Sequence, residues 1–148
     1  MEEEIKNCVE TLVNGGLILY PTDTVWGIGC DATNEEAVKK VYELKKRSKS
    51  KALIILISEY ANLYKLLDQV SPNAYDYMNT PKPTTVIFDN VKNISKHAIA
   101  KDGSAAIRLA SDVFCKKIID KLGQPIISTS ANISGEKNPK SFNEINKQ

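Results

Sequence analysis

The sequence predicts an α/β fold in which helices cover a sheet of mixed strand direction. Segments with apolar residues at helical spacing alternate along the chain with short apolar runs of strand length. Capping residues and glycines mark the boundaries between these segments. The 148 residues, 42% of them hydrophobic, suffice for one globular domain with a sizeable core. No linker or internal repeat divides the chain, so we expect a single domain over residues 1–148.

The first half of the chain predicts two helices, each followed by a strand. Apolar spacing predicts a helix that ends at Gly15-Gly16 and then a strand over 17–20. Thr33 and Glu36 have the spacing of a capping box and predict the start of the second helix, which a strand over 53–57 follows. The apolar residues that define the two helices are Ile5, Cys8 or Val9, Leu12, Val38, Val41, Tyr42 and Leu44.

The second half continues the alternation of helices and strands. Apolar spacing predicts a helix over 63–70, and Ser71-Pro72 is typical of the cap and first turn of a helix that holds Tyr75 and Met78. The remaining expected elements are strands over 84–88 and 105–109, a helix capped by Ser111 or Asp112 and ended by Gly123, and a strand that leads into Ser128.

The composition excludes several classes of protein. A net charge of +2 is too small to imply by itself a nucleic-acid or membrane partner. Cys8, Cys30 and Cys115 lie far apart without zinc-binding spacing, so we expect reduced, mostly buried thiols and no metal site. The acidic N-terminus lacks the apolar core of a signal peptide, and no apolar stretch reaches the ~20 residues of a membrane helix. We therefore expect a soluble, cytoplasmic protein without a membrane partner.

A run of small and polar residues, 128–135, follows the last predicted strand. Seven of its eight positions are small or polar, and ligands of open α/β sheets usually bind at such strand ends. Hydroxyls and the Asn132 amide suit phosphate oxygens, as does a nest of backbone N–H groups. The alternative is a turn in which Ser, Thr and Asn side chains bond only their own backbone.

A basic run over 45–51 forms a second candidate site. It holds five of the chain's 20 basic residues and no acid. The alternatives are a solvated charged face, or residues that favour the negative end of the preceding helix. Because the run leads directly into an apolar strand, its ends are expected to lie near the sheet. Arg47 there can clamp a phosphate bidentately, and lysines add point charges.

A third segment, 20–29, is interpreted as a strand that exits into a stiff proline turn bearing the hydroxyls of Thr22 and Thr24. Trp26 either lines a pocket or belongs to the core. Asp23 is expected to cap or form the turn, because no catalytic partner for it is apparent.

In this order the three segments resemble the YrdC/Sua5 family, the threonylcarbamoyl-AMP synthases. The resemblance covers the chain from about Gly15 to Gly135. It implies a twisted α/β fold with a large concave, positively charged groove. It also implies a nucleotidyltransferase that condenses L-threonine, bicarbonate and ATP into threonylcarbamoyl-AMP, with release of pyrophosphate. The product would pass to a threonylcarbamoyl transferase complex that modifies adenosine in tRNA.

The resemblance also assigns roles to residues of this chain. It implies that three basic residues carry catalysis, namely Lys45, Arg47 and Arg108. ATP would be held by the first two together with Thr85, Ser130 and Asn132. Thr22 and Ser128 would line the threonine pocket.

The expected chemistry needs no Ser/His/Asp relay. Once threonine has formed a carbamate, its oxygen is already an anionic nucleophile for the α-phosphate. Catalysis then depends on positioning two anions and neutralising charge as pyrophosphate leaves, with Mg²⁺ arriving with ATP. His97, the single histidine, lies beside no motif.

Two departures separate the chain from the family pattern. The family commonly has an aromatic-Pro-Gly-Pro-aliphatic-Thr segment, where this chain has the residues 80–85 with Thr84 at the apolar position. The capping-box pair Ser141 and Glu144 begins a helical pattern, yet the sequence stops at Gln148. We therefore expect the chain to lack the family's usual C-terminal helix and strand elements.

Two other functions compete with this interpretation. A non-catalytic module would hold tRNA or double-stranded RNA in the same groove through phosphate contacts alone. The pair Ser130 and Asn132 argues against it, since nucleotide chemistry needs such residues and general phosphate binding does not. The other is carbamoyl-adenylate chemistry of the kind found in hydrogenase maturation proteins, which carry zinc-finger and acylphosphatase-like segments that this sequence lacks.

Overall fold

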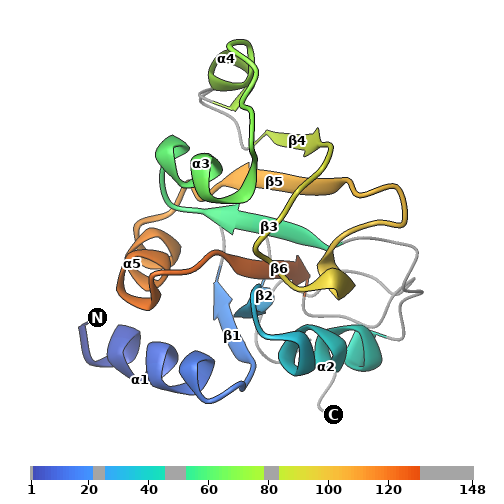
Figure 1. Cartoon of the computed structure of the whole chain (residues 1–148). Coiled ribbons are helices and arrows are strands. Elements are labelled where there is room, and N and C mark those ends of the chain that lie inside the picture. The colour runs from blue at the N-terminus through green and yellow to red at the C-terminus, as the bar shows by residue number, and fades with distance from the viewer. Residues whose placement is uncertain (1, 22–25, 46–52, 79–83, 131–148) are drawn as a thin grey trace.

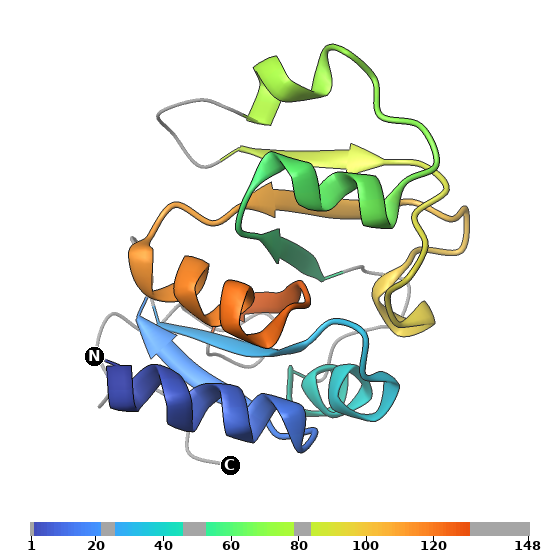
Figure 2. The same ribbon diagram turned by 60° about the vertical axis from the view of Figure 1, so that its left-hand side comes forward.

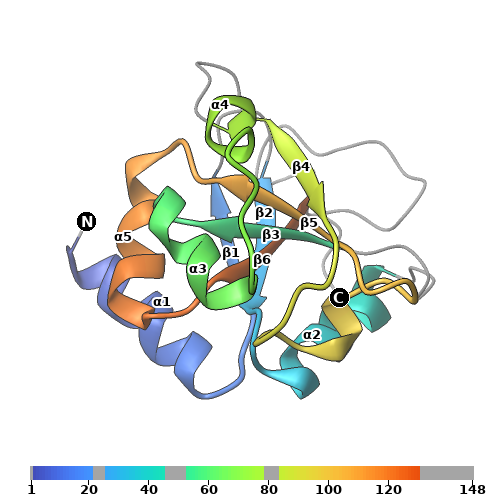
Figure 3. The same ribbon diagram turned by 45° about the horizontal axis from the view of Figure 1, so that its top comes forward.

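A mixed sheet of six described strands lies at the centre of the structure (Figure 1). The computed structural model describes residues 2–21, 26–45, 53–78 and 84–130. The strands are β1 (Ile18–Pro21), β2 (Trp26–Asp31), β3 (Ile54–Ile57), β4 (Thr85–Phe88), β5 (Ala105–Leu109) and β6 (Ile126–Ser130). Their order is β1-β2-β6-β3-β5-β4, and of the described neighbours β3 and β5 are parallel while the others are antiparallel. The predicted mixed sheet is confirmed, and Figure 3 shows its strands fanning out in a twist.

Helices pack on both faces of this sheet. The described helices are α1 (Glu2–Val13), α2 (Glu35–Lys45), α3 (Leu63–Leu66), α4 (Ala74–Met78) and α5 (Val113–Leu122), with short 3₁₀ turns η1 (Tyr60–Asn62) and η2 (Lys96–Ala98). Figure 2 shows α1 and α5 side by side near β1 and β6. No helix in the described ranges is long and apolar enough to cross a bilayer.

Two apolar cores lie between the sheet and the helices that pack on its two faces. The first core contains α2, α3 and one side of the central strands, with residues such as Val41, Leu63, Ile55, Ile107 and Ile127. The second core contains α1, α5 and the opposite side of the sheet, with Ile5, Leu12, Tyr20, Leu56, Ile118 and Ile126. Successive side chains of a strand point to opposite faces of the sheet, so neighbouring residues of one strand pack in different cores.

The end of α1 and the start of α5 follow the predicted signals. After α1, the N–H of Gly15 donates to Leu12 O at 3.0 Å and that of Gly16 to Thr11 O at 2.8 Å. Gly15 has φ +81°, which a residue without Cβ adopts freely, so the predicted stop is confirmed. The carboxylate of Asp112 accepts from the Cys115 N–H at 3.1 Å and so confirms the predicted cap of α5.

The predicted capping box of Thr33 and Glu36 is wrong by one residue. Asn34 caps α2, because its Oδ1 accepts from the Ala37 N–H at 3.0 Å. Thr33 instead donates to Asp31 Oδ1 from its backbone N–H at 2.8 Å and from its hydroxyl at 2.6 Å. Asp31 thus forms a local turn that leaves Asn34 as the cap.

Other element boundaries differ from the prediction. The helix predicted over 63–70 ends at Leu66, because Leu67 is extended with ψ 140°. α4 begins at Ala74 rather than directly after Ser71-Pro72. The segment 20–29, interpreted as a strand that exits into a proline turn, also contributes the first four residues of β2, which pairs antiparallel with β1.

Candidate functional site

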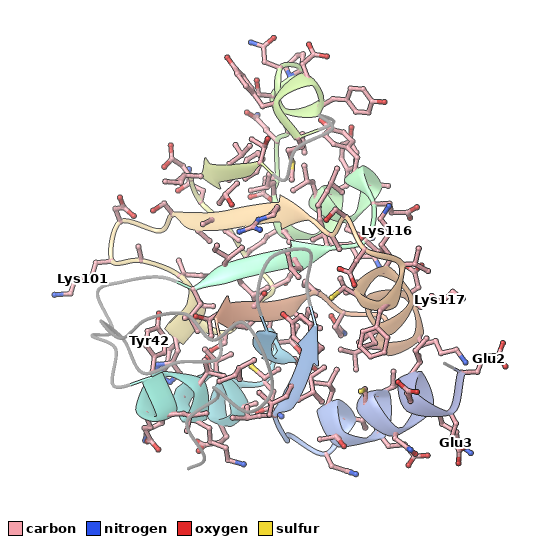
Figure 4. The ribbon with its side chains drawn as sticks, turned by 180° about the vertical axis from the view of Figure 1, so that it is seen from behind. Glu2, Glu3, Tyr42, Lys101, Lys116 and Lys117 are labelled. Carbon is pink, nitrogen blue, oxygen red and sulfur yellow. The ribbon has the colours of Figure 1, made fainter. Side chains whose placement is uncertain are left out.

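Three of the predicted site residues share one face of the sheet. Arg108 of β5 pairs with Leu56 of β3, and Ser128 of β6 pairs with Ile54 of β3. Thr85 of β4 pairs with Arg108. Residues that pair across a sheet project from the same side, so all three project from the side on which Leu56 packs in the second core. Figure 4 shows the molecule from this side, with α5 at one end of the strands.

Arg108 and Thr85 form a cross-strand hydrogen bond. The Nε–H of Arg108 donates to Thr85 Oγ1 at 3.1 Å. A guanidinium has five N–H donors, so this bond engages one of them and fixes the orientation of the plane. Thr85 was predicted to contact the nucleotide. The described contact gives its hydroxyl another partner, the guanidinium that is expected to neutralise charge at the reaction centre.

Ser128 receives a short hydrogen bond from a fully buried phenol. The Tyr20 hydroxyl donates to Ser128 Oγ at 2.6 Å, and the Tyr20 side chain is 0% exposed. The bond spans three strands, because Tyr20 lies on β1 and Ser128 on β6, with β2 between them. A Cβ on Gly29 of β2 would come within 2.8 Å of the Tyr20 ring and 3.0 Å of Ile127 O. Glycine at position 29 therefore leaves room for the Tyr20 ring.

The electrostatics around Tyr20 keep its phenol protonated. Burial raises the pKa of Tyr20 above its ordinary value, and the hydrogen bond to Ser128 offsets part of that effect. Cys115 and Asp112 raise the Tyr20 pKa further, whereas the Arg108 charge lowers it. Arg108 is therefore close enough to the Tyr20–Ser128 pair for its charge to affect the Tyr20 pKa.

Cys8, Cys30 and Cys115 form no disulfide bond within the described ranges. Burial, with a smaller effect of Asp31, raises the pKa of the Cys30 thiol to about 12. Burial and Glu4 raise the pKa of Cys8 as well. A thiol that stays protonated is a poor nucleophile and metal ligand, so these thiols are structural. Within the described ranges, no group of three or more His, Cys, Asp or Glu side chains gathers for a metal.

The two hydroxyl-rich motifs begin at the same end of the sheet. β1 ends at Pro21, directly before Thr22, and β6 ends at Ser130. Pro21 pairs with Trp26, and the next residue, Gly27, pairs with Ser130. The start of β2 thus lies between the two strand ends and brings the motifs to neighbouring positions.

The basic run is bounded by elements that pack on the sheet. Lys45 is the last residue of α2, which packs on β2. After the run, Leu53 is fully buried and leads into Ile54, the residue paired with Ser128. This agrees with the expectation that the chain lies near the sheet on both sides of the run, and the strand that follows the run pairs with Ser128 through Ile54.

The other predicted site residues lie outside the described residues or at their edge. Thr22, Arg47 and Asn132 fall outside them, as does most of the basic run that was expected to line a concave groove. Lys45 and Ser130 are placed as the last residues of α2 and β6. The roles of these five residues remain predictions.

Sequence reasoning missed the contribution of Tyr20. The residue was predicted as the end of a strand and the start of the segment 20–29 but was given no role of its own, and its partner lies 108 positions away. The available signal was an aromatic residue at the end of a predicted strand, directly before Pro21-Thr22.

Comparisons with known proteins place these features in context. Residues 10–148 match the Sua5/YciO/YrdC family, described as "Telomere recombination". A threonylcarbamoyl-AMP synthase of Saccharophagus degradans is 36% identical over 134 residues, which are 89% of this chain and 70% of the relative. One of Pseudoalteromonas translucida is 30% identical over 99% of this chain and 81% of the relative.

A solved structure of the family has the same fold as this chain. P. abyssi Sua5, crystallised in complex with L-threonine, superimposes with a TM-score of 0.88 at 28% identity. The match covers 98% of this chain and 43% of that protein, so the chain spans less than half the length of that relative. E. coli YciO has the same fold, with a TM-score of 0.82 at 24% identity.

Proposed function

Because the chain belongs to the Sua5/YciO/YrdC family, we propose that it is a threonylcarbamoyl-AMP synthase. One observation in the structure carries the proposal: Arg108 and Ser128 project from one face of the sheet, at whose end two of the predicted motifs begin. The relatives with this enzyme name match most of the chain and support the same activity.

In the proposed reaction L-threonine, bicarbonate and ATP yield threonylcarbamoyl-AMP, pyrophosphate and water. The threonine amine bonds to the bicarbonate carbon, and loss of water leaves a carbamate. A carbamate oxygen then attacks the α-phosphorus of ATP, and the bond to pyrophosphate breaks. No protein nucleophile is needed, so the work of the chain is to position two anions and to offset their charge.

The predicted residues divide this work between two ends of the site. Ser128 with Thr22 would hold threonine, and the L-threonine complex of P. abyssi Sua5 supports an amino-acid pocket in this fold. ATP would be held by Lys45, Arg47, Ser130 and Asn132. Arg108, oriented by Thr85, would offset charge at the α-phosphate. Mg²⁺ would enter as a complex with the ATP phosphates, which are its usual ligands.

The product would be consumed by a complex that transfers the threonylcarbamoyl group to adenosine in tRNA. A mixed anhydride of this kind hydrolyses readily, so direct transfer to such a partner is expected in the cytoplasm. The alternative is a protein that binds RNA without catalysing a reaction, and the following experiment distinguishes it from a synthase.

The direct test is incubation of the purified chain with ATP, Mg²⁺, bicarbonate and L-threonine, followed by mass spectrometry. Threonine-dependent threonylcarbamoyl-AMP and an equal amount of pyrophosphate are expected. Omission of threonine is the control. A folded protein that binds ATP, or that retains tRNA, but forms no product would contradict the proposed activity.

A further inference from the structure

The hydrogen bond between Tyr20 and Ser128 has a direction that limits what Ser128 can do. The phenol donates to Ser128 Oγ at 2.6 Å, so the serine oxygen is the acceptor in this bond. A serine hydroxyl has one proton to donate and two lone pairs. With one lone pair occupied by Tyr20, the serine proton is available to a partner on another side of the oxygen.

The chain keeps this arrangement fixed. Tyr20 is 0% exposed and packed in the second core, so its ring has no room to turn its hydroxyl away. Burial also keeps the phenol protonated, because it raises the pKa of Tyr20. A fully buried phenol proton needs an acceptor, and among the described residues Ser128 Oγ is the acceptor within reach of it, so Tyr20 donates in this bond.

The surroundings favour an anion as the partner of the serine proton. Arg108 projects from the same face of the sheet and acts on the same phenol electrostatically. The Asp112 carboxylate, which also acts on Tyr20, already accepts the Cys115 N–H as the cap of α5. A hydroxyl that is forced to donate and a guanidinium together match a carboxylate better than an ammonium group.

We propose that Tyr20 is a positioning residue that makes Ser128 a hydrogen-bond donor toward the carboxylate of the amino-acid substrate. This inference rests on the proposed function, because it requires threonine to bind beside Ser128. Gly29 supports this arrangement, because a Cβ at position 29 would lie only 2.8 Å from a ring carbon of Tyr20. Ser128 touches substrate in this proposal, and Tyr20 acts through it.

The decisive variant is Tyr20→Phe, which keeps the buried ring and removes the hydroxyl. Its dissociation constants are measured by calorimetry for L-threonine and for L-threonine amide, in which a neutral amide replaces the carboxylate. We expect Tyr20→Phe to weaken L-threonine binding about fivefold, the worth of one neutral hydrogen bond, and to leave amide binding nearly unchanged. KM for ATP should stay the same.

Two further variants exclude a merely structural role. Tyr42→Phe removes a phenol hydroxyl from the first core and should leave the threonine affinity unchanged. In a Ser128→Ala background, Tyr20→Phe should add no further loss of affinity, because Tyr20 acts through the serine. Thermal unfolding of each variant shows whether the fold is retained.

The outcomes separate the two proposals. Equal weakening of L-threonine and its amide, or no weakening by Tyr20→Phe, would overturn the role of Tyr20 while leaving the synthase intact. A loss that persists in the Ser128→Ala background would overturn it too. If the unaltered folded chain binds no threonine and forms no threonylcarbamoyl-AMP, the proposed function fails and this inference fails with it.

Discussion

The two faces of the central sheet differ in what they do, although the same strands form both. On one face Ile107 and Ile127 are fully buried in the first core. The next residues along the same strands, Arg108 and Ser128, project from the other face and are only partly buried. A step of one residue thus moves a side chain from the interior of the first core to a partly buried position in the candidate site, because side chains alternate along a strand. The comparison predicts that changes at Ile107 or Ile127 lower stability, whereas changes at Arg108 chiefly lower activity.

The largest effect is expected on the buried face. Ile127→Ala should lower the free energy of unfolding by about 2–5 kcal/mol, because it leaves a cavity in the first core. Urea denaturation measures it. The matched control is Ile87→Ala, at an isoleucine that is 72% exposed, with an expected change within about 0.5 kcal/mol. Similar losses for the two variants would contradict the assignment of the core.

Arg108→Ala should have the next largest effect, on activity. Loss of a charged hydrogen-bond donor should reduce kcat/KM by about 10- to 150-fold, equivalent to about 1.5–3 kcal/mol. The free energy of unfolding should change little, because the Arg108 side chain is only partly buried. Lys101→Ala removes an exposed positive charge elsewhere (Figure 4) and serves as the control. If both variants lose activity equally, net charge rather than position would explain the effect.

Ser128→Ala tests how far a residue of the candidate site also stabilises the second core, which contains Tyr20. It should lower the free energy of unfolding by about 1–3 kcal/mol, more than a typical exposed serine, because it leaves the buried Tyr20 hydroxyl without its partner. The double variant Tyr20→Phe/Ser128→Ala should recover most of this loss, since both polar groups are then absent. Chemical denaturation of the three variants measures the coupling. Additive losses would show that the hydrogen bond does not link the residues.

Thr85→Val should have the smallest effect. It keeps the shape of the side chain but removes the hydroxyl that accepts from Arg108 Nε. A reduction in kcat/KM of about 2- to 10-fold is expected, corresponding to one hydrogen bond of about 0.5–1.5 kcal/mol. Thr85→Ser, which retains the hydroxyl, should restore steady-state activity. Failure of serine to do so would argue against positioning through this bond.

Most helices and strands could be predicted because their apolar periodicity is strong and their ends carry caps or glycines. β2 could not, since Gly27 and Gly29 are poor strand formers by propensity. Their value becomes visible only when Tyr20 packs against Gly29. Similarly, Thr33 has the pattern of a cap, but Asp31 captures its N–H and hydroxyl, which only the local turn reveals.

For the candidate site, the residues could be predicted from the sequence, but the hydrogen bonds that orient them could not. Ser128 was found in one of the three ordered motifs and Arg108 through the family resemblance that the motifs carry, and the strand register then placed both on one face. The bonds that orient them were not predictable, because Arg108 and Thr85 lie 23 positions apart and Tyr20 and Ser128 lie 108 apart. Contacts over such separations depend on strand order, and short-range sequence patterns carry no information about strand order.

The place of β6 in the sheet also governs when the site can form. β6 comes last in sequence among the described strands, yet it pairs with β2 on one side and β3 on the other. Of the described strands, β6 is the one that pairs with both β2 and β3, so it joins the β1–β2 pair to the group of β3, β5 and β4. Because these pairings span long sequence separations, we expect them to form more slowly than local ones. Ser128 lies on β6, so it reaches its place beside Tyr20 when β6 pairs with β2.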